Sequence, residues 1–218
     1  MTEIVAKRDA FEQLAQAWAS EQGQELWNKI IPTAQGEPPP ESALRLESFS
    51  DSFILTFWSD EPAPRQVNRL GNDLIAMFLY GIDQGMLFRG AMAYGPFCQG
   101  TRSLVGPAVD EAYEWSGLAS WAGILCAPSA RKAIDDAIPE AERRALQGDW
   151  ARWPVPLADR STFDTWVLWW PRTGKRNAVS DLFLVPPTPR DVETKMSNTL
   201  KFYDWAVGLF KVGVKDEP

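Results

Sequence analysis

The stretch that decides the fold is residues 42–58, SALRLESFSDSFILTFW. Apolar residues alternate with other residues in both halves, as at Leu44 and Leu46 before the centre and from Phe53 onward after it. Alternation of this kind is typical of strands with one buried face, and a Ser-Asp pair between two such runs is a turn sequence. The stretch therefore predicts a β-hairpin with Asp51 at its turn.

Outside this hairpin, apolar spacing predicts further elements on both sides. We expect strands at residues 3–8, 87–95, 121–127 and 163–171, and helices at 9–31, 65–86, 106–119, 129–147 and 187–213, the last of them amphipathic. The first six elements follow the order β-α-β-β-α-β, which is typical of a ferredoxin-like α+β fold with helices on one face of an antiparallel sheet. We expect residues 1–218 to form a single domain with an elaborated C-terminal third.

Composition narrows the classes of function. The net charge of −7 argues against a DNA- or RNA-binding protein, but a nucleotide bound through metal ions remains compatible with it. The absence of histidine excludes Ser-His-Asp and Cys-His catalysis and histidine-ligated zinc. An enzyme of this composition works with carboxylates, metal ions, Lys, Arg and backbone groups, and phosphoryl transfer suits those groups.

The chain shows no signal-peptide pattern and no apolar run of 18 residues, so we expect a cytoplasmic protein that is not embedded in a membrane. Cys98 and Cys126 lie in apolar sequence and are expected to be reduced core residues. The 11 tryptophans, among them Trp166, Trp169 and Trp170, are interpreted as core, with a base-stacking pocket or a subunit interface as the alternative.

Four segments carry a resemblance to a known family. Residues 47–57 (ESFSDSFILTF), 88–95 (FRGAMAYG) and 106–114 (GPAVDEAYE) resemble the class III adenylate/guanylate cyclase superfamily, and most of all the small bacterial pyrimidine cyclases of anti-phage defence. Residues 195–202 (KMSNTLKF) resemble a late motif of small stand-alone relatives. The resemblance frames residues 1–120 and covers the C-terminal third loosely. It implies a homodimer that converts a ribonucleoside triphosphate, with UTP and CTP as candidates, to a 3′,5′-cyclic monophosphate and pyrophosphate.

The resemblance also implies two divalent metal ions, Mn²⁺ or Mg²⁺, bound by two catalytic aspartates. Asp51 matches the second metal aspartate, and its alternative role is that of a turn residue. Asp9, 42 positions earlier, is the candidate for the first. Lys7 and Arg8 precede Asp9 where the family has an apolar strand, so a helix N-cap is an equal alternative for Asp9.

Substrate-binding residues follow from the same resemblance. Glu47 and Ser103 match the positions that recognise the base, although Glu47 is also compatible with a solvated strand residue. Asp110 and Glu114 occupy the positions of the family's Asn and Arg, which orient the ribose and stabilise phosphate charge. Carboxylates cannot donate hydrogen bonds to a phosphate, so a catalytic donor has to come from elsewhere, with Arg89 as one candidate. Arg102, Lys195 and Lys201 are further candidates.

Three functions therefore remain open. The first is a metal-dependent nucleotide cyclase that produces a defence signal. The second is a catalytically lapsed cyclase-fold module that senses nucleotides or binds a partner, as the acidic residues at 110 and 114 favour. The third is a palm-type nucleotidyltransferase, for which the chain lacks a recognisable basic triphosphate-binding helix.

Overall fold

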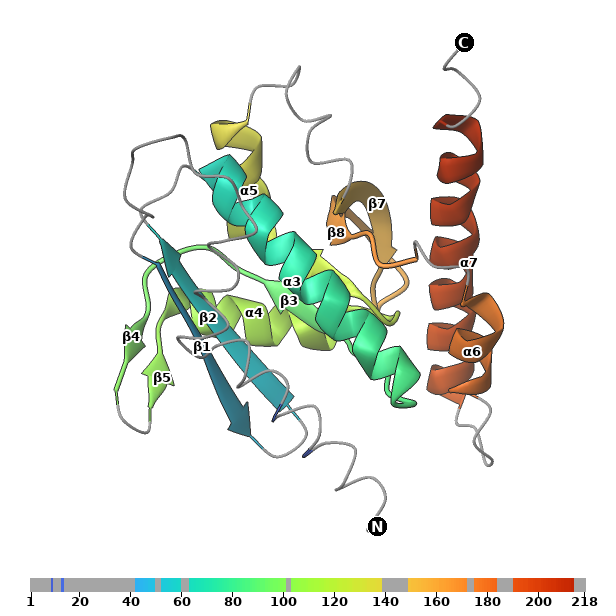
Figure 1. Cartoon of the computed structure of the whole chain (residues 1–218), viewed down its shortest axis with the longest axis horizontal. Helices are drawn as coiled ribbons and strands as arrows, with labels where there is room; N and C mark the ends of the chain where they lie inside the picture. The colour runs from blue at the N-terminus through green and yellow to red at the C-terminus, as the bar shows by residue number, and fades with distance from the viewer. Residues whose placement is uncertain are drawn as a thin grey trace. The chain divides into compact units, whose positions relative to one another are not determined.

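The computed structural model describes residues 9, 13, 42–49, 52–59, 63–100, 103–138, 149–171, 175–183 and 190–213. They belong to two compact units, residues 1–66 and 67–218. In chain order the elements are β1 (Ser42–Phe49), β2 (Ser52–Ser59), α3 (Ala63–Asp83), β3 (Gly90–Met92), β4 (Cys98–Gln99), β5 (Leu104–Val105), α4 (Pro107–Leu118), β6 (Ile124–Cys126), α5 (Pro128–Ala137), β7 (Trp150–Pro156), β8 (Thr162–Leu168), α6 (Arg176–Asp181) and α7 (Arg190–Gly213) (Figure 1).

The predicted hairpin is confirmed as the antiparallel pair β1 and β2, drawn in blue in Figure 1. Its register places Leu46 opposite Leu55 and Phe49 opposite Ser52. Because Phe49 pairs with Ser52, the connection between the strands consists of residues 50 and 51, which lie outside the described residues.

The second unit contains a four-stranded sheet in the order β3-β6-β8-β7. β3 and β6 are parallel, whereas β6–β8 and β7–β8 are antiparallel. The protein is thus an α+β fold with a mixed sheet, and the expectation of a wholly antiparallel sheet is wrong for these four strands. The chain leaves β3, passes through the β4–β5 hairpin and α4, and returns as β6 in the same direction, as a parallel pair requires.

The core of this unit is rich in aromatic side chains. Trp121, Trp153 and Trp170 surround Phe202 of α7, with ring centroids 4.5, 5.5 and 6.2 Å from its ring. Phe78 of α3 stacks on Trp170 at 4.8 Å. Trp166 and Trp169 are also buried, so the interpretation of the tryptophans as core residues is confirmed for this group.

Several elements are shorter than predicted or were not predicted. β3 covers only residues 90–92 of the expected strand, while α5 ends at Ala137 and the chain at 139–148 lies outside the described residues. The expected strand at 3–8 also lies outside them. Cys126 is buried as expected, but Cys98 is exposed because it lies in the short β4–β5 hairpin. No helix within the described ranges has the length and apolar character to cross a membrane.

Candidate functional site

The two predicted metal aspartates are described unequally. Asp9 is helical and exposed, whereas Asp51 lies outside the described residues. Glu47 lies on β1 with Ile54 as its Cα partner, four positions before residue 51. Within the part of the chain that the structure describes, no group of three His, Cys, Asp or Glu residues is placed to hold a metal ion. The paired-aspartate site therefore stays a prediction.

The N-terminal end of α4 holds two of the predicted substrate residues. Its N-cap is Gly106, with φ of 145°, a conformation that side chains rarely adopt. A Cβ at residue 106 would also lie 2.7 Å from the carbonyl oxygen of Pro96 and 2.8 Å from Cα of Phe97. Glycine is thus required where the GPAVDEAYE segment begins. Ser103 and Asp110 are exposed and both lie within four residues of this N-cap.

Arg89 lies at the other end of α4. Its Nη1 donates a hydrogen bond to the carbonyl oxygen of Ala119, the C-cap of the helix, over 3.4 Å. A guanidinium there satisfies a free carbonyl and complements the negative end of the helix dipole. From Asp110 to Ala119 the helix rises roughly 14 Å. The structure thus does not bring Arg89 and Asp110 together, and Arg89 serves the helix end.

One exposed face of α4 is continuous, and we call it the α4 stripe: Asp110, Tyr113, Glu114, Gly117 and Leu118. These residues follow the helical spacing 0, 3, 4, 7 and 8. No residue of α4 is fully buried. Neither Asp110 nor Glu114 forms an ion pair with any described residue, and the stripe carries no basic side chain. The face therefore offers acceptors and apolar surface, without a cation to hold a phosphate.

The side of α4 that faces α5 has a different arrangement. Glu111 Oε1 accepts a hydrogen bond from the backbone N–H of Ser129 over 3.0 Å, and Ser129 Oγ accepts one from the backbone N–H of Tyr94 over 2.9 Å. Ser129 is in the first turn of α5, where free N–H groups and the helix dipole favour an anion. A carboxylate of the protein itself thus occupies the position where a ligand phosphate would otherwise bind.

The KMSNTLKF segment joins α7 to the loop after α4 through hydrogen bonds. Asn198 Nδ2 donates to the carbonyl oxygen of Ser120 over 2.8 Å, and the backbone N–H of Ala122 donates to Thr199 Oγ1 over 2.8 Å. Lys195 pairs with Asp191 over 3.1 Å, and its hydrogen bond holds the pKa of Asp191 below the usual range. This segment therefore has a structural role in the described chain.

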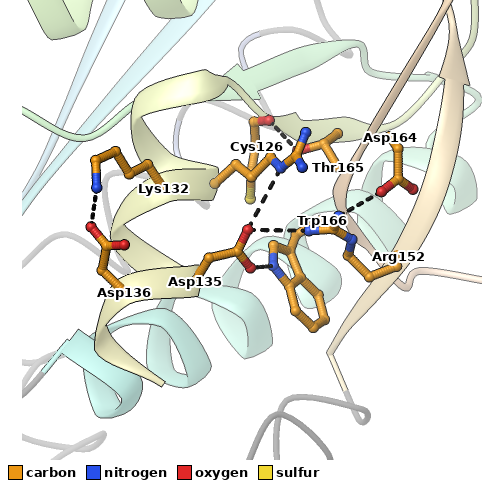
Figure 2. Close-up of polar contacts among 9 residues, drawn as sticks. Cys126, Lys132, Asp135, Asp136, Arg152, Asp164, Thr165 and Trp166 are labelled. Carbon is orange, nitrogen blue, oxygen red and sulfur yellow. Dashed lines mark hydrogen bonds and ion pairs between the residues drawn. The ribbon is translucent and has the colours of Figure 1, made fainter. Parts of the chain in front are cut away.

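Sequence patterns did not reveal a polar cluster that joins α5 to β7 and β8, which Figure 2 shows. Asp135 accepts hydrogen bonds from Trp166 Nε1 over 3.0 Å and from Arg152 Nη1 over 3.4 Å. Arg152 Nη2 also donates to Asp164 over 2.5 Å, and its guanidinium lies 5.5 Å from the Trp166 ring centroid. The partners are separated by 12 to 31 positions, so no local motif could have signalled them.

A hollow of about 330 Å³ lies beside this cluster, lined by Pro128, Arg131, Lys132, Asp135, Asp136 and Phe163. Its charges are already balanced, because Arg131 pairs with Asp135 at 3.6 Å and Lys132 pairs with Asp136. Nearby Cys126 is no nucleophile, since burial, with the Asp135 carboxylate adding to it, raises the pKa of its thiol well above the ordinary range.

Comparison with known proteins adds no relative: no family model, no curated protein and no solved structure matches this chain.

Proposed function

We propose that this chain is a metal-dependent nucleotide cyclase that converts a ribonucleoside triphosphate, with UTP or CTP as the first candidates, to a 3′,5′-cyclic monophosphate. The observation that carries this proposal is the β1–β2 hairpin, whose register leaves Ser50 and Asp51 as the connection between the strands. α3, β3 and α4 follow it in the order of the segments that resemble the cyclases.

In this proposal the carboxylates of Asp9 and Asp51 hold two divalent ions, because Mg²⁺ and Mn²⁺ prefer oxygen ligands. The ions supply activation of the ribose 3′-hydroxyl and stabilisation of phosphate charge. The new bond joins O3′ to the α-phosphorus, the bond from the α-phosphorus to pyrophosphate breaks, and the hydroxyl proton leaves to solvent. The active species is a homodimer, as the resemblance implies.

The test is turnover of each of the four ribonucleoside triphosphates with Mn²⁺, followed as pyrophosphate and cyclic monophosphate. Asp51→Asn keeps the side-chain shape and removes the charge, so we expect activity to fall at least about 100-fold. Asp181→Asn, an exposed aspartate on α6, is the matched control and should retain full activity. A parent chain that turns over none of the four substrates, or an Asp51→Asn variant as active as the parent, would refute the proposal.

The α4 stripe favours a second candidate, a cyclase-fold module that has lost catalysis and binds a partner or senses nucleotides. Asp110 and Glu114 are acceptors where transition-state donors are needed, and Arg89 contacts the opposite end of the helix. The double variant Asp110→Asn/Glu114→Arg separates the two candidates. Restored donors should raise the turnover of a weak cyclase by up to about 100-fold. They should leave a lapsed module without turnover although it still binds nucleotide or partner.

A further inference from the structure

We propose that the α4 stripe is a docking surface for a basic amphipathic helix of a partner protein. This inference rests on the second candidate function and names the chemistry of the partner. Three features of the described chain support it. They are exposed apolar side chains, a glycine in α4 that no packing contact requires, and acidic side chains without ion-pair partners among the described residues.

The exposed large apolar side chains of the described residues fall in one stretch of the chain that includes α4. Within the described ranges, the exposed large hydrophobic residues are Tyr94, Val105, Tyr113 and Leu118, with exposed fractions of 64, 58, 83 and 37%. All four lie in the segment from the end of β3 to the end of α4, and the last two belong to the stripe. The apolar part of the proposed docking surface is therefore Tyr113 and Leu118, which are exposed on one helix.

Gly117 gives the second argument. A glycine inside a helix costs about 1 kcal/mol relative to alanine, so it needs a reason. Gly71 and Gly81 of α3 have one, because a Cβ there would meet the Trp150 side chain at 2.5 Å and the Phe88 ring at 2.0 Å. A Cβ at Gly117 would meet nothing within 4 Å, which is also true at Gly208 of α7, but Gly117 lies on the face that carries Tyr113 and Leu118. Because residue 117 has no side chain and the space beside it is open, a partner's apolar side chain can approach the helix closely there, four residues from Tyr113. We call this position the seat.

The acidic charge of the α4 stripe indicates that the partner is basic. Asp110 and Glu114 lie one turn apart on the stripe without ion-pair partners among the described residues, and the chain carries a net charge of −7. Pairing two α4 stripes would bring like charges together, which opposes a second copy as occupant. A helix with Lys or Arg beside its apolar face matches both the acidic and the apolar residues. The 12-residue helix is about 18 Å long, so the interface is small and the complex transient.

Two labelled 18-residue peptides test this, one an amphipathic Leu/Lys helix and the other the same pattern with Glu for Lys. Fluorescence anisotropy against the full chain should show saturable binding of the Leu/Lys peptide alone. Gly117→Gln fills the seat without changing charge and should weaken binding about tenfold, a loss of about 1.4 kcal/mol. Gly208→Gln is the matched control, because Gly208 is also exposed in a helix with nothing within 4 Å of an added Cβ. This control should bind like the parent.

Two double variants distinguish an effect of charges at the docking surface from an effect of the total charge of the chain. Asp110→Asn/Glu114→Gln and Asp181→Asn/Glu193→Gln remove the same two charges from exposed positions, and only the first pair should weaken binding. An equal loss in both pairs, no effect of Gly117→Gln, or no saturable binding of the Leu/Lys peptide overturns the proposal. Unfolding midpoints at or above that of the parent show that the Gly117→Gln variant is folded. Triphosphate turnover, measured on the same samples, decides between the two candidate functions, so a failure of peptide binding is distinguished from a failure of either function.

Discussion

Thr199→Val tests whether α7 holds the loop between α4 and β6 in place. In the parent, Thr199 Oγ1 accepts the Ala122 N–H over 2.8 Å and its hydroxyl donates to the Lys195 carbonyl oxygen over 2.7 Å. Valine keeps the shape and removes the acceptor, so a buried N–H is left without a partner. That loss costs about 1–3 kcal/mol. A midrange loss of about 2 kcal/mol lowers Tm by about 4–8 °C in a chain of this size.

The assay is denaturant unfolding together with amide hydrogen exchange. Thr194→Val is the matched control on the same helix, because Thr194 is exposed and its hydroxyl donates only to the Arg190 carbonyl oxygen of its own helix, over 3.2 Å. We expect the midpoint to fall for Thr199→Val with an unchanged m-value, and the Ala122 amide to exchange faster. If Thr199→Val loses no more stability than Thr194→Val, the loop does not depend on this bond and the reasoning fails.

Three further predictions concern other parts of the chain. Gly106→Ala should destabilise the protein by about 2 kcal/mol or more in denaturant unfolding, because its φ of 145° is strained for alanine. Hydrogen bonds from Arg176 lower the pKa of Asp204. The stability that this pair contributes is therefore present above about pH 4 and is lost on further acidification. The difference in Tm between the parent and Asp204→Asn should accordingly close towards about pH 2. With a thiol reagent, native protein should expose one reactive group, Cys98, and denatured protein two, since Cys126 is buried and neutral; two reactive thiols in the native protein would contradict this.

Local patterns were sufficient to predict the elements that have a regular period. The hairpin, α3, α4 and α7 follow from alternation or helical spacing, and the structure confirms all four. β7 was missed because Pro154 and Pro156 interrupt its pattern. Those prolines are tolerated because β7 is the edge strand of its sheet, where backbone N–H groups need no partner on one side.

The site was less predictable because its contacts connect distant positions. From the sequence, Glu111 is expected to be a solvated helix residue. In the structure it accepts a hydrogen bond from the first turn of α5, 18 positions away. In the sequence, Asn198 is part of the KMSNTLKF segment. Only the structure shows that its side chain donates a hydrogen bond to a carbonyl oxygen 78 positions away. Exposure of Asp110 and Glu114 was implicit in their charge, but the position of Arg89 at the opposite end of α4 depends on how β3 and α4 pack, which spacing does not encode.

The bond between Ala122 and Thr199 also sets an order of events during protein synthesis. The two residues are 77 positions apart, which a ribosome adding about 5–20 residues per second covers in roughly 4–15 s. Throughout that interval β3 and Trp121 have already been made, and Trp153 and Trp170 are added during it. Phe202, whose ring contacts all three tryptophans, has not yet been made. The indole side chains of these tryptophans therefore stay exposed until α7 has been made. Chaperones that recognise aromatic segments can bind the nascent chain during that interval.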